Sequence, residues 1–149
     1  MLETIIYLAL LSVLMSGALL VSYGLLEGAG RVSGNTAAAD EGSFVLRKID
    51  WALNATSSQA RILAPAPGSY GGMLSLRRPD GTRVDIWLSG STTMISEDGG
   101  FTDYPLTTVN VAVSALRFYQ IPSSGGAPGG IEASTTIGGS TFSTTHYFR

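Results

Sequence analysis

The sequence has no cysteine among its 149 residues, which excludes disulfide bonds, thiolate metal sites and cysteine nucleophiles. Histidine occurs once, at His146 near the end of the chain. One imidazole cannot by itself form a catalytic triad or a metal site. We therefore expect His146 to lie on the solvent face of the last strand and to have no chemical role.

Charge is also scarce, because Asp, Glu, Lys and Arg together make up 13% of the residues, about half of the usual share. Nine basic residues against 11 acidic ones leave a net charge of −2, so direct electrostatic binding of nucleic acid is not expected. Arg77, Arg78 and Arg83 could form a small basic patch, but three arginines at a turn more often serve solubility.

Motifs for catalysis or cofactor binding are missing as well. The glycine-rich segment 68–72 lacks the lysine and the following helix of a phosphate-binding loop. The sequence therefore predicts neither an enzyme nor a bound cofactor.

A long apolar run opens the chain, since residues Thr4 to Leu26 include no charged side chain. As a helix this run measures roughly 35 Å, which is enough to cross a hydrocarbon core of about 30 Å. A secretory signal peptide fits poorly, because there is no basic region before the run and the run is too long. A membrane-spanning helix fits well.

One carboxylate, Glu3, stands at the edge of this run. The positive end of the helix dipole favours a negative charge there. Ionisable groups beside a membrane span are costly and usually paired, which makes them candidates for function. A surface glutamate at the level of the lipid headgroups is the equally weighted alternative.

Glycines follow at helical spacing: Gly17, Gly24, Gly28, Gly30 and Gly34. Steps such as Gly24 to Gly28 allow close approach of helix backbones in lipid, while each glycine also weakens a helix by about 1 kcal/mol relative to alanine. The glycines therefore predict either a packing face or a segment that readily unwinds.

Helical periodicity returns after Phe44 and predicts an amphipathic helix that ends at Pro65 and Pro67. Trp51 is expected to pack against the following domain. The predicted apolar face consists of Val45, Ile49, Ala52, Thr56, Ala60 and Leu63.

Strand patterns fill the remainder of the chain. Two alternating runs, 73–77 and 83–88, flank the turn Arg78-Pro79-Asp80-Gly81-Thr82. Further strands are predicted at 92–96, 109–121, 131–137 and 141–148, with a flexible loop at 123–130. Strands that follow one long helix predict an α+β fold, in which a small antiparallel sheet borrows the amphipathic helix for its core.

Three acidic residues near a Gly-Gly turn, Glu97, Asp98 and Asp103, are weak candidates for calcium. A solvated acidic turn is the preferred interpretation.

The first residues, Met1-Leu2-Glu3-Thr4-Ile5-Ile6-Tyr7, together with the apolar helix resemble the prepilin-type methylation motif of type IV pilins and type II secretion pseudopilins. The turn at 78–82 and the final segment 141–149 are similar to the first hairpin and last strand of minor pilins. The family places its glutamate five residues into the mature chain, after a basic leader and a cleavage glycine. In this sequence the glutamate is the third residue. The position of the mature N-terminus therefore stays open here.

The resemblance implies a minor-pilin-like filament subunit with three regions: a transmembrane and filament-core helix (1–30), a glycine-rich segment with the amphipathic half (31–67), and a β-domain (68–149). Glu3 would pair with the terminal amine of a neighbouring subunit. The implied partners are the lipid bilayer, copies of itself or related pilins, a prepilin peptidase and an inner-membrane assembly platform. The alternative is a permanently anchored extracytoplasmic binding or adhesion module.

Overall fold

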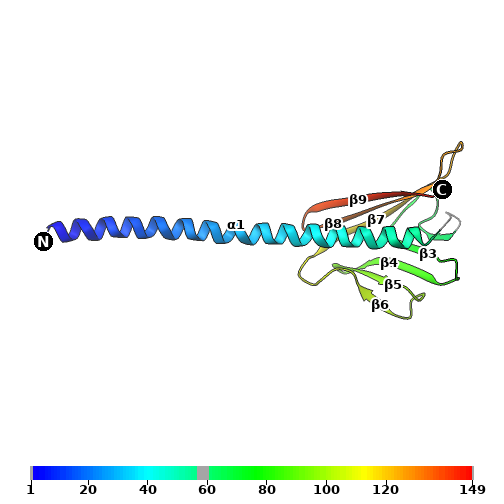
Figure 1. Cartoon of the computed structure of the whole chain (residues 1–149), viewed down its shortest axis with the longest axis horizontal. Coiled ribbons are helices and arrows are strands. Elements are labelled where there is room, and N and C mark those ends of the chain that lie inside the picture. The colour runs from blue at the N-terminus through cyan, green and yellow to red at the C-terminus, as the bar shows by residue number, and fades with distance from the viewer. Residues whose placement is uncertain (1, 57–60, 149) are drawn as a thin grey trace. The chain divides into compact units, whose positions relative to one another are not determined.

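The computed structural model describes residues 2–56 and 61–148, which form one long helix followed by nine strands (Figure 1). The helix, α1, spans Leu2–Asn54. The strands are β1 (Ile62–Ala64), β2 (Tyr70–Gly71), β3 (Met73–Arg77), β4 (Arg83–Ser89), β5 (Thr92–Ser96), β6 (Asp103–Pro105), β7 (Val113–Ile121), β8 (Gly130–Ile137) and β9 (Ser140–Tyr147). The expected α+β fold with a long N-terminal helix is confirmed.

Two compact units divide the chain, residues 1–36 and residues 37–149. The first contains only the N-terminal turns of α1, and the second contains the last turns of α1 and every strand. The boundary falls inside a helix that stays continuous through the glycine-rich segment.

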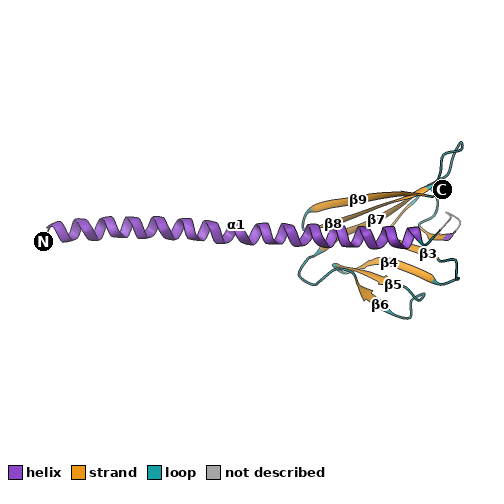
Figure 2. Ribbon diagram, viewed as in Figure 1, coloured by secondary structure: helices purple, strands orange, loops and turns teal. Residues whose placement is uncertain are grey.

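The strands form two antiparallel sheets where the sequence predicted one. The first sheet has the order β1-β3-β4-β5-β6, and the second has the order β2-β7-β8-β9. The last turns of α1 pack against both sheets, as Figure 2 shows for the purple helix among the orange strands. The buried core joins α1 (Val45, Ile49, Ala52, Leu53), the first sheet (Leu74, Leu76, Val84, Ile86, Ile95) and the second sheet (Leu116, Phe118, Ile131, Ala133).

The helix ends at Asn54, earlier than the prolines predicted. Val45, Ile49, Ala52 and Thr56 are buried as expected, but Leu63 lies in β1 and is half exposed; Ala60 is outside the described residues. Asn, Ser and Thr compete for backbone hydrogen bonds and have low helix propensity. Residues just before a proline also favour extended backbone. Ile62–Ala64, which precede Pro65, therefore form β1 and pair with β3 instead of continuing the helix.

Two other expectations need correction. Val109 is 95% exposed in a turn, and the strand starts at Val113, where a register shift leads to Ala115. His146 lies on the half-buried face of β9, with its ring 5.3 Å from that of Phe148, because strand alternation places it on the side of Phe142 and Thr144. Trp51 contacts the following domain as expected, because Arg78 lies over its ring together with Lys48, although the ring stays partly exposed.

Candidate functional site

The N-terminal turns of α1 present an apolar surface that no other described part of the chain covers. All described residues of this unit, 2–36, are exposed, including the large side chains from Leu2 to Leu26. Monomeric soluble proteins rarely expose a contiguous apolar surface of this extent. By length and composition the helix can cross a membrane, so this surface is the candidate functional site.

The three serines of the apolar run form their hydrogen bonds within the helix itself. Ser12, Ser16 and Ser22 donate hydrogen bonds to carbonyls one turn earlier, over 2.6, 2.8 and 2.9 Å. A lipid environment requires such internal satisfaction, because hydrocarbon offers no hydrogen-bond partner. The serines therefore do not oppose insertion of the segment into a bilayer.

Glu3 lies in the first turn of α1, where the free N–H groups carry the positive end of the helix dipole. The Tyr7 hydroxyl donates to Glu3 Oε1 over 3.4 Å, and both side chains are exposed. A long bond to a neutral phenol does not neutralise a carboxylate. Glu3 thus keeps the capacity to pair with a cation of another molecule.

A second carboxylate follows the apolar run. Glu27 accepts a hydrogen bond from Arg31 over 2.6 Å, one helical turn away, with both side chains exposed. This pair is internally compensated and worth only about 0.3–0.5 kcal/mol at an exposed helix surface. The two glutamates that bound the run therefore differ, because among the described residues only Glu27 is paired with a cation of its own helix.

The predicted glycine face has free space around it. A Cβ atom added at any of these five positions would meet nothing within 4 Å outside the local helix backbone: Gly17, Gly24, Gly28, Gly30 and Gly34. A shallow hollow of about 580 Å³ at Gly17 is lined by Val13, Leu14, Ala18 and Val21. Packing or unwinding at these glycines stays a prediction about assembled molecules.

The acidic residues proposed for calcium have other partners. Glu97 pairs with Lys48 over 2.6 Å and lies 3.9 Å from Arg78. Asp98 Oδ1 accepts hydrogen bonds from Ser96, Phe101 and Thr102 over 2.9–3.0 Å. Within residues 2–56 and 61–148, no three His, Cys, Asp or Glu side chains gather in a metal-binding arrangement.

The hydrogen bonds at Asp98 have an electrostatic consequence. Donation from the Thr102 backbone N–H, and then from the Thr102 and Ser96 hydroxyls, lowers the pKa of Asp98 to about 2. The Asp98 carboxylate is therefore ionised where it closes the β5–β6 turn. Its negative charge is stabilised by these hydrogen-bond donors.

The three arginines of the predicted basic patch separate into different settings. Arg83 Nε bonds Asp85 over 2.8 Å and Ser75 over 3.0 Å. Arg78 lies over the ring of Trp51, 4.6 Å from its centre, and Arg77 is exposed. Two of the three are thus engaged within the domain, where they tie the β3–β4 hairpin together and to α1.

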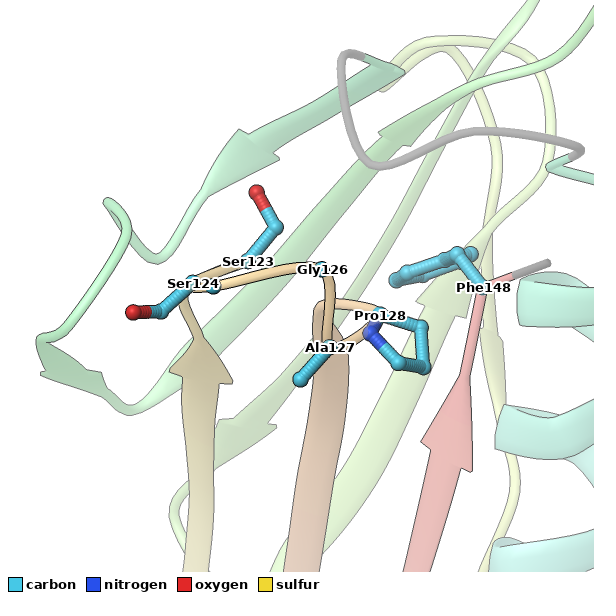
Figure 3. A pocket seen from close by; sticks show the side chains of 7 residues that line it. Ser123, Ser124, Gly126, Ala127, Pro128 and Phe148 are labelled. Carbon is cyan, nitrogen blue, oxygen red and sulfur yellow. The ribbon is translucent and has the colours of Figure 1, made fainter.

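The β7–β8 loop borders a hollow of about 500 Å³ (Figure 3), formed by Ser123, Ser124, Gly125, Gly126, Ala127, Pro128 and Phe148. The Ser123 and Ser124 hydroxyls point away from the Phe148 ring. Its lining carries no charged side chain, so the hollow has no converging polar groups of the kind that ligand sites require.

Two contacts that the sequence did not reveal connect α1 to the loop at Thr108 and to strand β9. Glu41 accepts hydrogen bonds from the Thr108 backbone N–H, over 3.1 Å, and from its hydroxyl. Gly42 lies against Phe142, so an added Cβ would come within 2.6 Å of the ring. A glycine within an amphipathic helix was a usable signal for close approach, but nothing marked Glu41.

Comparison of the chain with protein-family models, curated proteins and solved structures yields no match.

Proposed function

We propose that this chain is a pilin-like structural subunit, of the minor-pilin or pseudopilin kind, of a type IV or type II secretion-type filament. One observation carries the proposal: the same helix is uncovered and apolar in residues 2–26, whereas from Val45 onward two sheets bury one of its faces. Such a helix suits a subunit held first by lipid and later by its neighbours. The resemblance of the first seven residues to the pilin motif supports the same assignment.

Before assembly the subunit spans the inner membrane once, with its α+β domain outside the cytoplasm. A prepilin peptidase and an assembly platform act on it, and it then joins copies of itself or related pilins in an extracellular or periplasmic filament. Lipid tails are as apolar as the helix, so the hydrophobic effect gives little gain when the helix leaves the bilayer. Close van der Waals packing between helices in the filament core would supply the driving force instead.

Glu3 is the polar determinant of this assembly. A terminal amine of a neighbour would be costly in an apolar core, because an unpaired buried charge destabilises by about 3–5 kcal/mol. The Glu3 carboxylate supplies the counter-charge and thereby selects the axial position of the incoming helix. No catalytic role is part of this proposal.

The test is replacement of Glu3 by Leu and by Gln in the native host, with quantification of the chain in membranes and in sheared filaments. Both variants should insert normally, while their incorporation falls by about tenfold or more, since one unpaired charge costs more than 1.4 kcal/mol. Glu27→Gln is the matched control, because Glu27 is paired within its own helix, and its incorporation should stay near that of the natural chain.

Two results would count against the proposal. Equal incorporation of Glu3→Leu would remove the role of Glu3. A chain found only in membranes, with no filament fraction, would favour the permanently anchored binding module, for which the uncovered helix is simply a membrane anchor.

A further inference from the structure

The last turns of α1, which belong to the α+β domain, carry a shallow hollow of about 410 Å³. It is lined by Phe44, Arg47, Lys48 and Trp51. Spacings of three and four residues place these side chains on one side of the helix, and the two sheets cover another side. Both aromatic side chains stay exposed, Phe44 by 46% and Trp51 by 41%.

Cations hold the Trp51 ring in place. Lys48 Nζ lies 3.8 Å from the ring centre, and the Arg78 guanidinium lies 4.6 Å from it. Lys48 is itself fixed by its ion pair with Glu97, over 2.6 Å. Because the ring is already positioned but not covered, a partner that contacts it would order few further side chains.

The hollow has an excess of positive charge. Three cations line or border it, Arg47, Lys48 and Arg78, and among the described residues the carboxylate that they contact is Glu97. Arg47 is exposed, and its side chain has no ion pair or hydrogen bond with any described residue. Complementary charge favours a partner that brings a carboxylate to Arg47.

A turn of the same domain presents an aromatic side chain to solvent. Phe101 is 91% exposed, while its backbone N–H and that of Thr102 donate to Asp98 Oδ1 over 3.0 and 2.9 Å. Gly99 and Gly100 have φ values of +81° and +100°, which glycine adopts without strain. The hydrogen bonds of the turn thus hold Phe101 away from its own domain.

A free carboxylate lies close to Phe101. Asp103 is exposed at the start of β6, and its side chain has no ion pair or hydrogen bond with any described residue. Two residues along a chain are at most about 7 Å apart, so one partner surface can reach both. Phe101 and Asp103 therefore offer an aromatic ring and a negative charge, which complement the aromatic rings and the free cation of the hollow.

We propose that the hollow receives Phe101 of a second copy of this chain, and that Asp103 of that copy pairs with Arg47. Each chain carries both halves of the contact, so one copy can receive a neighbour and insert into another. Such head-to-tail contacts can repeat along a filament; this step rests on the proposed function. Aromatic and arginine side chains are those that contribute most to binding at interfaces.

A photo-reactive phenylalanine in place of Phe101 tests the contact in the full chain, since an exposed position tolerates the larger ring. Light and heavy isotopic copies are made in succession in the same cells, and sheared filaments are illuminated. An adduct that joins Phe101 of one copy to residues 44–51 of another is expected. An adduct within one copy, to another polypeptide or to lipid, or no adduct at residues 44–51, would overturn the proposal.

Reversal of the two charges tests the pairing. Arg47→Glu and Asp103→Arg each bring like charges together, so each should lower the yield of the adduct at least about tenfold. The double variant has opposite charges again, and its yield should return to within about threefold of the natural pair. Equal yields from the single and double variants would contradict the pairing.

Glu132 supplies the matched control, because it is an exposed carboxylate of β8 with no ion pair or hydrogen bond to a described side chain. Glu132→Arg changes the net charge as much as Asp103→Arg does, and the adduct should keep its full yield. An equal loss with Glu132→Arg would show that net charge, not the contact with Arg47, sets the yield. Thermal unfolding of each variant in micelles confirms that the domain stays folded.

Failure of this inference is distinguishable from failure of the proposed function. Filaments that contain the chain but give no adduct between copies overturn the contact alone. Absence of the chain from filaments, together with an adduct between copies in membranes, overturns the filament role and supports the contact.

Discussion

Residues 2–36 and 37–54 belong to one helix, yet their side chains have opposite surroundings. In the first segment every large apolar side chain is exposed, and in the second Val45, Ile49 and Leu53 are fully buried. The difference shows that a segment can form a helix whether or not the rest of the chain buries its side chains. Within the first segment, residues 4–26 are apolar on all sides, which suits lipid or other helices. The second segment has one apolar face that two sheets cover.

The largest effect should come from comparing the same residue type in the two segments. Ile49→Ala should lower the free energy of unfolding of the α+β domain by about 2–5 kcal/mol, because it leaves a cavity in the core. Ile6→Ala should leave that value unchanged, since Ile6 is exposed in the other unit. Denaturant titration in micelles, followed by the fluorescence of Trp51 and Trp87, measures both. Equal destabilisation by the two variants would contradict the difference in burial between the two segments of α1.

Effects of intermediate size are expected from two glycines, one in each segment of α1. Gly42→Ala should destabilise the domain by about 1–3 kcal/mol, because the new methyl group overlaps the Phe142 ring. Gly28→Ala has open space and should instead favour the helix by up to about 1 kcal/mol. Thermal unfolding of the domain reports the first variant, and helix content by circular dichroism reports the second. A neutral Gly42→Ala would argue against the close approach.

The smallest expected effect concerns the charge of Asp98 in the exposed β5–β6 turn. Its pKa is lowered from 3.8 to about 2 in the folded chain, so its contribution to stability is present above pH of about 4 and disappears as the pH falls through about 2. Asp98→Asn should remove this dependence in that window. The carboxyl carbon shift in an NMR titration measures the pKa, and titration near 3.8 would contradict the turn geometry.

The sequence was sufficient for the elements that rest on local signals. The apolar run, the hairpin at Arg78–Thr82 and the Gly138-Gly139 turn all depend on neighbouring residues, and the structure has them in place. The end of α1 was misplaced because competition between helix and β-pairing is decided by Leu76 and Ser75, which are distant in sequence from Ile62 and Ala64.

The candidate site divides in the same way. Glu3 and the apolar run were recognisable, because their composition carries the signal. The engagement of Glu97 by Lys48 and of Asp98 by Thr102 was not, since an acidic turn looks alike with or without internal partners. The hollow at Phe44 and Trp51 was also invisible, because helical spacing does not reveal which side of a helix the sheets leave open.

The central claim is that residues 2–26 lie in lipid before assembly and against other subunits afterwards. The direct measurement uses Leu14→Cys, which is the only thiol in a chain that naturally has none. In membranes the thiol should resist a water-soluble maleimide, whereas Ser91→Cys on the domain surface should react. In sheared filaments Leu14→Cys should form disulfide-linked oligomers on oxidation. Full labelling of Leu14→Cys in membranes, or absence of the chain from sheared filaments, would contradict the account.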